Sequence, residues 1–385
     1  MTVRSSGAPE ALFGEPAVIH GFGRVRFGFG VVASLGAELA ELGIARPILA
    51  TEWHLAELGI LQRVREHAPR GAAMFDALPA QPTVAGAEGL AAAYVENGCD
   101  GIVAVGGGVV IDMCKAAALL TGNPGPLIRY SGHPERIVGP VAPIVAVPTT
   151  AGTGSEVSRG AGIHPAPGQR EFGVRGEPLL PRVALCDPDL TLSLPPRATA
   201  GTGLDALGHC IEGFLSPAVN PVVDAIALDG IGRVARYVER AVADGTDREA
   251  RWHMMMAAVE GGIAISKGLG CAHALSMTFS DSDLHHGAIV TVALPVVMRF
   301  VAPAAPAKLA QIAEAMGAPS GTPAADALAA LNARVGLPKT IRALGYRGND
   351  HEALAAFATE NYFNRTSPLV PTLDDYRRII AELLH

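Results

Sequence analysis

The arrangement of apolar residues changes near the middle of this 385-residue chain, and that change limits the folds that it can adopt. In the first half, short apolar runs that suit buried strands alternate with Ala- and Leu-rich segments of helical period, as in a parallel sheet with helices on its faces. From about Pro195 onward, helical periodicity continues almost without interruption. The predicted strands are residues 46–50, 101–105, 143–147 and 182–186. The predicted helices of the second half include residues 224–240, 249–266, 287–301, 306–316, 324–335, 351–363 and 373–384.

This change predicts two domains, an α/β domain over residues 1–190 and an all-helical domain over residues 191–385. Prolines between the two halves, among them the run Leu194–Pro196, interrupt both patterns and mark the boundary. At roughly 150 residues per domain, two domains suit the length of the chain. Because threonine is a common N-cap, the first long helix of the second domain can begin at Thr199 or Thr202.

Charge and composition exclude several classes of protein. The net charge is −7, with 30 basic and 37 acidic residues and no basic block, which argues against nucleic acid as a partner. With 49% hydrophobic residues the chain is not disordered, and no uncharged apolar run reaches the roughly 18 residues of a membrane span. The five cysteines include no CxxC pair, and Met1–Ala17 does not resemble a signal peptide. We therefore expect a cytoplasmic protein with a small-molecule substrate and no membrane partner.

Three consecutive glycines, Gly106, Gly107 and Gly108, lie directly after the strand 101–105 and open a helix. Glycines let the backbone approach a ligand closely, and the N-terminus of the following helix attracts a phosphate. The spacing matches neither GxGxxG nor Walker A, so a tight turn without a ligand is the alternative.

A second loop of small and hydroxyl residues, Pro148–Glu156, follows the third strand. Ligand crevices form at the carboxyl ends of parallel strands, although an ordinary polar loop would have the same composition. Two such loops on neighbouring strands together favour a nucleotide. Glu52 closes the first strand, where an acid can bind a ribose 2′-hydroxyl and repel a 2′-phosphate, which favours NAD over NADP unless this carboxylate is only solvated.

A set of possible metal ligands lies in the second half. Asp205 and His209 are four residues apart, so on a helix they share one face. His273 and His286, with His285 adjacent, lie further along the chain. An aspartate and three histidines suit Fe²⁺ or Zn²⁺, although each histidine taken alone could be structural.

Four segments of the chain, in the same order, resemble the iron-containing (group III) alcohol dehydrogenase family. The family pattern GGGSxxDxxK is similar to residues 106–115, and PTTAGTGSEVS occurs at residues 148–158. The third segment is TGLDALGHCIE at residues 202–212. The fourth comprises GLGCAH at residues 268–273, HG at residues 286–287 and LPVVMRF at residues 294–300. The resemblance implies a dinucleotide-binding α/β domain and a helical metal domain, with the architecture of dehydroquinate synthase. It also implies hydride transfer between NAD(P) and an alcohol or aldehyde, in a homo-oligomer of two or more subunits.

The resemblance also implies which residues bind the metal and which bind the cofactor. Asp205, His209, His273 and His286 fall on the positions of the metal ligands, through which they would act in catalysis. The expected cofactor-binding residues are Glu52, Gly106, Gly107, Gly108, Val109, Asp112, Thr149, Thr150, Thr153 and Leu190.

Three positions depart from the family pattern. Val109 replaces a serine of the cofactor loop, and Met277 replaces a histidine that lies near the nicotinamide in many members. The interval from His273 to His286 is one residue shorter, which leaves His285 as the alternative ligand. With Met277 in place of histidine, His285 could relay the proton, or the cofactor ribose and water could do so.

The prediction is a metal-dependent, NAD(P)-linked alcohol dehydrogenase or aldehyde reductase that acts on a small alcohol, diol or hydroxy acid. Arg159, Arg170 and Arg175 follow the threonine-rich loop. An arginine fork would favour a hydroxy acid such as 4-hydroxybutyrate, whereas the alternative is that these are surface charges on a hairpin. Two other hypotheses remain. One is a lyase like dehydroquinate synthase, which uses NAD and a metal, and the other is a metal-free paralogue that only binds nucleotide.

Overall fold

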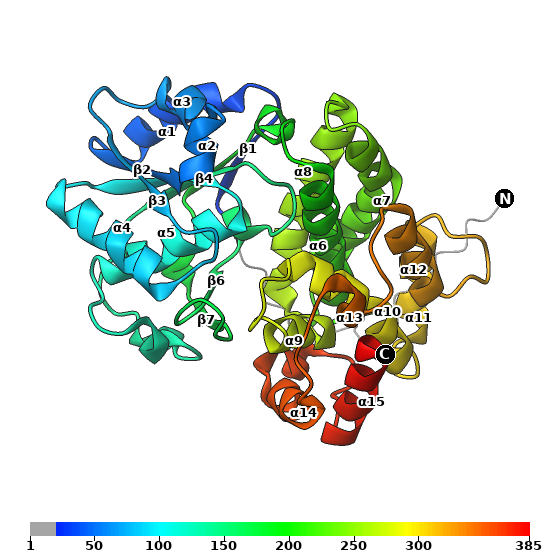
Figure 1. Cartoon of the computed structure of the whole chain (residues 1–385). Coiled ribbons are helices and arrows are strands. Elements are labelled where there is room, and N and C mark those ends of the chain that lie inside the picture. The colour runs from blue at the N-terminus through cyan, green and yellow to red at the C-terminus, as the bar shows by residue number, and fades with distance from the viewer. Residues whose placement is uncertain (1–20) are drawn as a thin grey trace.

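A six-stranded parallel sheet forms the centre of the N-terminal half in the computed structural model, which describes residues 21–385 (Figure 1). The strands lie in the order β1-β8-β5-β4-β2-β3. They are β1 (Arg24–Phe27), β2 (Pro47–Glu52), β3 (Ala73–Leu78), β4 (Gly101–Gly106), β5 (Ile144–Pro148) and β8 (Val183–Cys186). The predicted strands are the four central ones, whose residues are almost all buried. The edge strands β1 and β3 were missed because much of each is exposed, so neither is a continuous apolar run.

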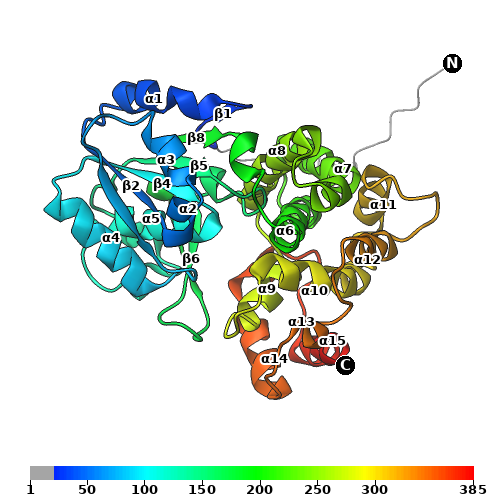
Figure 2. The ribbon, with the colours of Figure 1, turned by 45° about the horizontal axis from the view of Figure 1, so that its top comes forward.

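Helices cover both faces of this sheet, because successive strand residues point to opposite sides. In β4, Ile102 and Ala104 pack with α4 and α5, whereas Val103 and Val105 pack with α1 and α3. The helices are α1 (Leu35–Glu41), α2 (Trp53–Glu57), α3 (Ile60–Arg65), α4 (Val84–Glu96) and α5 (Gly108–Leu120). A separate antiparallel hairpin, β6 (Gly160–Ile163) and β7 (Phe172–Arg175), extends from the α/β part toward the helical part (Figures 1 and 2).

The C-terminal half is built around α6 (Pro196–Leu215), in which every residue from Thr199 to Leu215 is buried. It packs against α7 (Pro221–Ala243), α8 (Arg248–Ala264) and α10 (His286–Val301) (Figure 2). The other helices are α9 (Cys271–Thr278), α11 (Pro306–Ala315), α12 (Ala324–Arg334), α13 (Ile341–Leu344), α14 (His351–Glu360) and α15 (Leu373–Leu384). The predicted α/β domain followed by a helical domain is confirmed. The predicted boundary at residue 190 falls in a short 3-10 helix, Pro188–Thr191, and stays a prediction.

The start of α6 differs from the prediction. The helix begins at Pro196, so neither Thr199 nor Thr202 is its N-cap. Both threonines lie inside the helix, where their hydroxyls donate to the carbonyls of Leu194 and Ala198 at 3.2 and 2.8 Å. Proline is well tolerated at the first helical position, since its missing N–H has no partner there. The N-cap is Pro195, so the predicted cap at a threonine is wrong by about one turn for Thr199 and about two turns for Thr202.

Glycines join the two halves of the molecule. Gly154 has a φ of +62°, and a Cβ placed on it would lie 2.3 Å from the Cα of Gly262 on α8. A Cβ on Gly152 would lie 2.3 Å from the carbonyl oxygen of Thr202 on α6. The loop after β5 therefore rests directly on the backbones of two helices of the other half, a contact that side chains would prevent.

Two further expectations concern the chain as a whole. Within residues 21–385 all five cysteines are free. No helix in that range is both long and apolar enough to cross a membrane. The predicted absence of a signal peptide concerns Met1–Ala17, which lie outside the described residues.

We predict that Gly262→Ala destabilises the protein by about 1–3 kcal/mol, the usual cost of an overfilled contact. The new methyl group would lie 2.5 Å from the carbonyl oxygen of Gly154 and would force the loop off α8. Gly89→Ala on α4 is the matched control, because its nearest neighbour would be the ring of Phe75 at 3.5 Å. Thermal unfolding of both variants tests this, and equal melting temperatures would contradict it.

Candidate metal centre and cofactor site

Helix α6 carries the first two predicted metal ligands on one buried face. The Oδ1 atom of Asp205 and the Nε2 atom of His209 are 3.9 Å apart, as the four-residue spacing predicts. Both side chains are almost fully buried. A carboxylate enclosed in this way needs a positive partner, since burying an isolated charge is costly.

Helices α9 and α10 bring two further imidazoles to this carboxylate. Asp205, His273 and His286 each offer an atom within 4.8 Å of the others, and they form the one such metal-binding group found among residues 21–385. His286 Nε2 lies 4.0 Å from Asp205 Oδ1. His209 is not part of this triple, but its ring stacks on that of His273 with the centroids 4.7 Å apart. The four predicted ligands therefore lie together, and their role as ligands is taken up below as a proposal.

Two buried atoms at this point fit a metal ion. Asp205 Oδ1 and His273 Nε2 have no hydrogen-bond partner in the part of the chain that the structure describes. Burial lowers the pKa of His209 to about 4, so this imidazole is neutral and its lone pair is available. Burial alone would lower the pKa of His286, but the carboxylates of Glu171 and Asp205 outweigh it and raise the pKa to about 9. The site thus attracts positive charge.

The structure separates His286 from its neighbour His285. The side chain of His285 packs on α6, where a Cβ on Gly201 would lie 2.9 Å from its Nδ1 atom. His285 is not in the group with Asp205, and burial lowers its pKa. Met277, the other departure from the family pattern, accepts a hydrogen bond on its sulfur from the side-chain amide of Asn361 at 3.3 Å.

Two glutamates to which the sequence assigned no role face the imidazoles: Glu212, which is buried, and Glu171, which is partly buried. Glu212 Oε2 accepts a hydrogen bond from His273 Nδ1 at 2.5 Å. Glu171 Oε1 lies 3.7 Å from His286 Nδ1. Glu212 follows His209 by three residues on α6, a spacing that could have indicated the same helix face. Glu171 comes from the hairpin just before β7, and no local pattern points to it.

The two predicted cofactor loops lie in contact at the carboxyl ends of β4 and β5. Thr149 N–H donates to the carbonyl of Gly106 at 3.1 Å. A Cβ on Gly107 would lie 3.0 Å from Thr150, and one on Gly108 would lie 2.5 Å from Thr153. No side chain caps the N-terminus of α5, so its first N–H groups are available to an anion.

The remaining predicted cofactor residues have varied surroundings. Glu52 ends β2 at the same edge of the sheet, and burial raises the pKa of its carboxyl group. Val109 is half-buried in the first turn of α5, and Leu190 is fully buried below the sheet edge. Asp112 accepts hydrogen bonds from the Ser155 hydroxyl and, at 2.9 Å, from the N–H of Gly162. Asp112 therefore fixes the loop that follows β5, and its contact with the cofactor stays a prediction.

A buried lysine strengthens the same loop. Lys115 Nζ donates to Ser155 Oγ, Ser158 Oγ and the carbonyl of Gly160 at 2.9, 3.2 and 2.7 Å. Burial lowers the pKa of this ammonium group to about 8. The shape of the loop thus depends on α5, the helix whose N-terminus faces the predicted phosphates.

Of the three arginines considered for substrate binding, two are engaged with protein groups. Arg159 forms an ion pair with Glu177 at 3.0 Å. Arg170 donates to the carbonyl of Thr278 and to Asp281, both at 2.9 Å, and so ties the hairpin to the helical domain. Arg175 lies at the end of β7 and is exposed.

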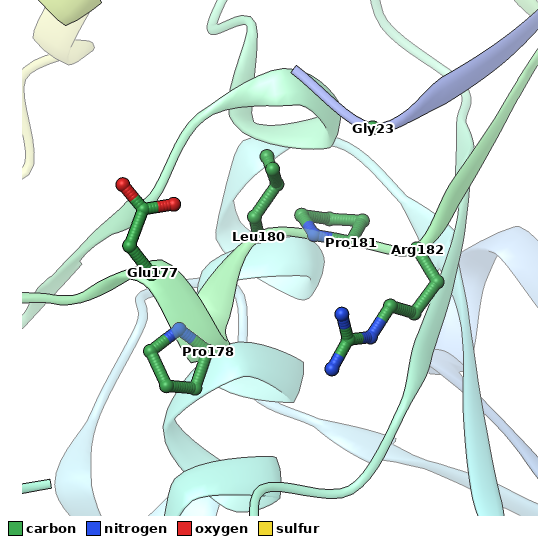
Figure 3. A pocket seen from close by; sticks show the side chains of 6 residues that line it. All are labelled: Gly23, Glu177, Pro178, Leu180, Pro181 and Arg182. Atoms are coloured by element: carbon green, nitrogen blue, oxygen red, sulfur yellow. The ribbon is translucent and has the colours of Figure 1, made fainter. Parts of the chain in front are cut away.

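None of the predicted metal ligands or cofactor-binding residues lines a pocket of about 410 Å³ that the structure contains within residues 21–385 (Figure 3). Two of its lining residues, Gly23 and Arg182, directly precede β1 and β8, so the pocket lies at the amino ends of these strands. Ligands of open parallel sheets bind at the carboxyl ends instead, so this pocket is not the cofactor site. Its lining residues are Gly23, Glu177, Pro178, Leu180, Pro181 and Arg182.

Comparison with known proteins identifies the family of this chain. The model of the iron-containing alcohol dehydrogenases matches residues 23–188, and the model of the C-terminal region of the Fe-containing alcohol dehydrogenase family matches residues 199–384. The chain is 42% identical to a 4-hydroxybutyrate dehydrogenase of Cupriavidus necator, over 95% of this chain and 99% of that protein. It is 33% identical to an NAD-dependent methanol dehydrogenase of Bacillus methanolicus, over 93% and 97% of the two chains.

Solved structures agree as well. A 1,3-propanediol oxidoreductase has a TM-score of 0.89 and 31% identity, covering 96% of this chain and 100% of that one. A sulfoacetaldehyde reductase from Bifidobacterium kashiwanohense, solved with NAD⁺, has a TM-score of 0.87 and 27% identity, covering 96% and 99%. The chain therefore belongs to the iron-containing alcohol dehydrogenase family, whose members are NAD-linked oxidoreductases with a divalent metal.

Proposed function

We propose that this enzyme interconverts a small ω-hydroxy acid and its aldehyde with NAD, and that 4-hydroxybutyrate and 4-oxobutanoate are the pair. The observation that carries this proposal is the 42% identity to a 4-hydroxybutyrate dehydrogenase over nearly the full length of both chains. The grouping of Asp205, His273 and His286 supports it, because a chain with these groups intact can hold the metal that the reaction needs.

Asp205, His209, His273 and His286 would hold the cation, Fe²⁺ or Zn²⁺. When bound, the cation supplies Lewis-acid polarisation of the substrate oxygen, and NAD supplies the hydride acceptor. The buried Asp205 carboxylate offsets the positive charge, and the neutral His209 imidazole contributes a lone pair. Residues 106–108 and 149–153, at the N-terminus of α5, would bind the pyrophosphate.

The proton that leaves the alcohol needs a route out of the site. Met277 cannot carry a proton, so the route differs from one that uses a histidine at this position. His285 remains the predicted relay, although its side chain lies against Gly201 rather than within the metal group. The cofactor ribose and water are the alternative. We also propose a cytoplasmic location and a homo-oligomer, which follow from the cysteine usage and from the family.

The proposed substrate is tested with a panel of alcohols, diols and hydroxy acids after Fe²⁺ or Zn²⁺ has been restored. We predict that kcat/KM for 4-hydroxybutyrate exceeds that for 1-butanol by at least about tenfold, or about 1.4 kcal/mol. The two compounds have the same carbon chain and differ by the carboxylate. Equal values would contradict the proposal. Accumulation of NADH in proportion to substrate distinguishes a dehydrogenase from a lyase that regenerates NAD⁺.

We predict that Glu52→Gln lowers the preference for NAD over NADP by about tenfold, because the amide no longer repels a 2′-phosphate. Glu57→Gln, an exposed site one turn further on α2, is the matched control and should leave the preference unchanged. The measurement is the ratio of kcat/KM for the two cofactors. An unchanged ratio in Glu52→Gln would place this carboxylate outside the ribose site.

We predict that His286→Asn and His285→Asn differ sharply in metal binding. His286 lies in the group with Asp205, so its loss should weaken the affinity for Zn²⁺ by more than about 100-fold, beyond the range typical of residues that only support a ligand. His285→Asn should keep the affinity of the original protein. The metal content per chain after loading and gel filtration measures both. The reverse result would make His285 the ligand.

A further inference from the structure

Glu212 lies at the end of α6 that follows the metal ligands, with its side chain only 3% exposed. Its two oxygens accept three hydrogen bonds from the first turn of α9. Oε1 accepts from the backbone N–H of Ala272 at 2.7 Å. Oε2 accepts from the backbone N–H of His273 at 3.2 Å and from the Nδ1 atom of the same residue at 2.5 Å.

The third of these bonds determines which nitrogen of His273 carries the proton. A carboxylate only accepts hydrogen bonds, so Nδ1 must be the protonated nitrogen. In the neutral ring the lone pair is then on Nε2, the nitrogen that is buried and lacks a partner within residues 21–385. His273 is in the group with Asp205 and His286 that could hold a metal ion, and Nε2 is the ring nitrogen that Glu212 leaves free for it.

The surroundings of Glu212 suit a carboxylate better than the amide of a glutamine. The start of a helix presents unpaired N–H groups and favours negative charge. Gly270 leaves the necessary room, because a Cβ on it would lie 2.9 Å from Glu212 Oε1. A glutamine of the same shape would offer a single carbonyl oxygen to three donors, and its NH₂ group would face an N–H.

We propose that Glu212 is a positioning residue for the metal centre, which holds His273 as the Nδ1–H tautomer and directs Nε2 to the ion. This role rests on the proposed function of His273 as a ligand. Helix α6 then supplies two ligands, Asp205 and His209, and also sets the orientation of a third on α9. A supporting carboxylate of this kind fixes the ring and makes it a stronger donor to the metal.

The alternative is that Glu212 only caps α9 and stabilises the fold. A cap would be satisfied by the two backbone N–H groups and would leave the tautomer of His273 and the affinity for metal unaffected. The two roles therefore differ in metal binding and in the state of one imidazole, and both can be measured without an activity assay.

The experiment uses the full chain after removal of metal. Zn²⁺ is titrated into the protein in competition with a chromophoric chelator, for the original chain, Glu212→Gln and Glu260→Gln. The last is the matched control, a buried glutamate on α8 whose Oε1 atom accepts a hydrogen bond from Arg233 at 3.1 Å. We predict that Glu212→Gln raises the dissociation constant about 10–100-fold and alters the absorption spectrum of bound Co²⁺, whereas Glu260→Gln changes neither.

A folded Glu212→Gln variant with the original affinity and Co²⁺ spectrum would overturn the proposal. Should that variant fail to fold, ¹⁵N NMR of the metal-free original chain decides, with His273→Asn used for assignment. The Nδ1–H tautomer at His273 is expected, and the Nε2–H tautomer would overturn the proposal. If the original chain bound no Zn²⁺, the metal site itself would fail, while the NMR result would still report on Glu212.

Discussion

The buried carboxylate of Asp205 is the constraint on which the rest of the structure depends. An isolated charge in a protein interior costs several kcal/mol or more, so it persists only where positive charge or hydrogen bonds compensate it. Here three helices direct imidazoles toward it, and none of the described side chains hydrogen-bonds its Oδ1 atom. The proposed divalent cation would complete this arrangement. Helix α6 is buried along nearly its whole length because it must hold this carboxylate at the centre of the helical domain.

The cofactor loops and the metal helix are in direct contact. Gly152 lies against the carbonyl of Thr202, one turn of α6 before Asp205, and Gly154 lies against Gly262 on α8. The same loop is fixed to α5 through Lys115 and Asp112. The loop that is predicted to bind the dinucleotide is therefore held against the helix of Asp205 by backbone packing rather than by long side chains, which would suit a hydride transfer that needs close alignment.

Patterns within short stretches of the sequence were enough to predict much of the fold and of the candidate metal site. Continuous apolar runs identified the central strands, and the four-residue spacing of Asp205 and His209 placed them on one face. Contacts between distant segments were not predictable in the same way. His285 and His286 are adjacent in sequence, so only the path of the chain into α10 separates them. Glu212 meets His273 across 61 residues, and the edge strands lack the apolar continuity on which strand prediction depends.

The hairpin β6–β7 connects the α/β domain to the helical domain through Arg170. Arg170 joins it to Thr278 and Asp281 of the helical domain, so rotation of the two domains away from each other must first break these bonds. The Arg170–Asp281 pair is partly exposed to water, and pairs of this kind contribute only about 1 kcal/mol or less. The Arg170–Asp281 pair therefore adds little to the cohesion of the two domains, and added salt would weaken it further.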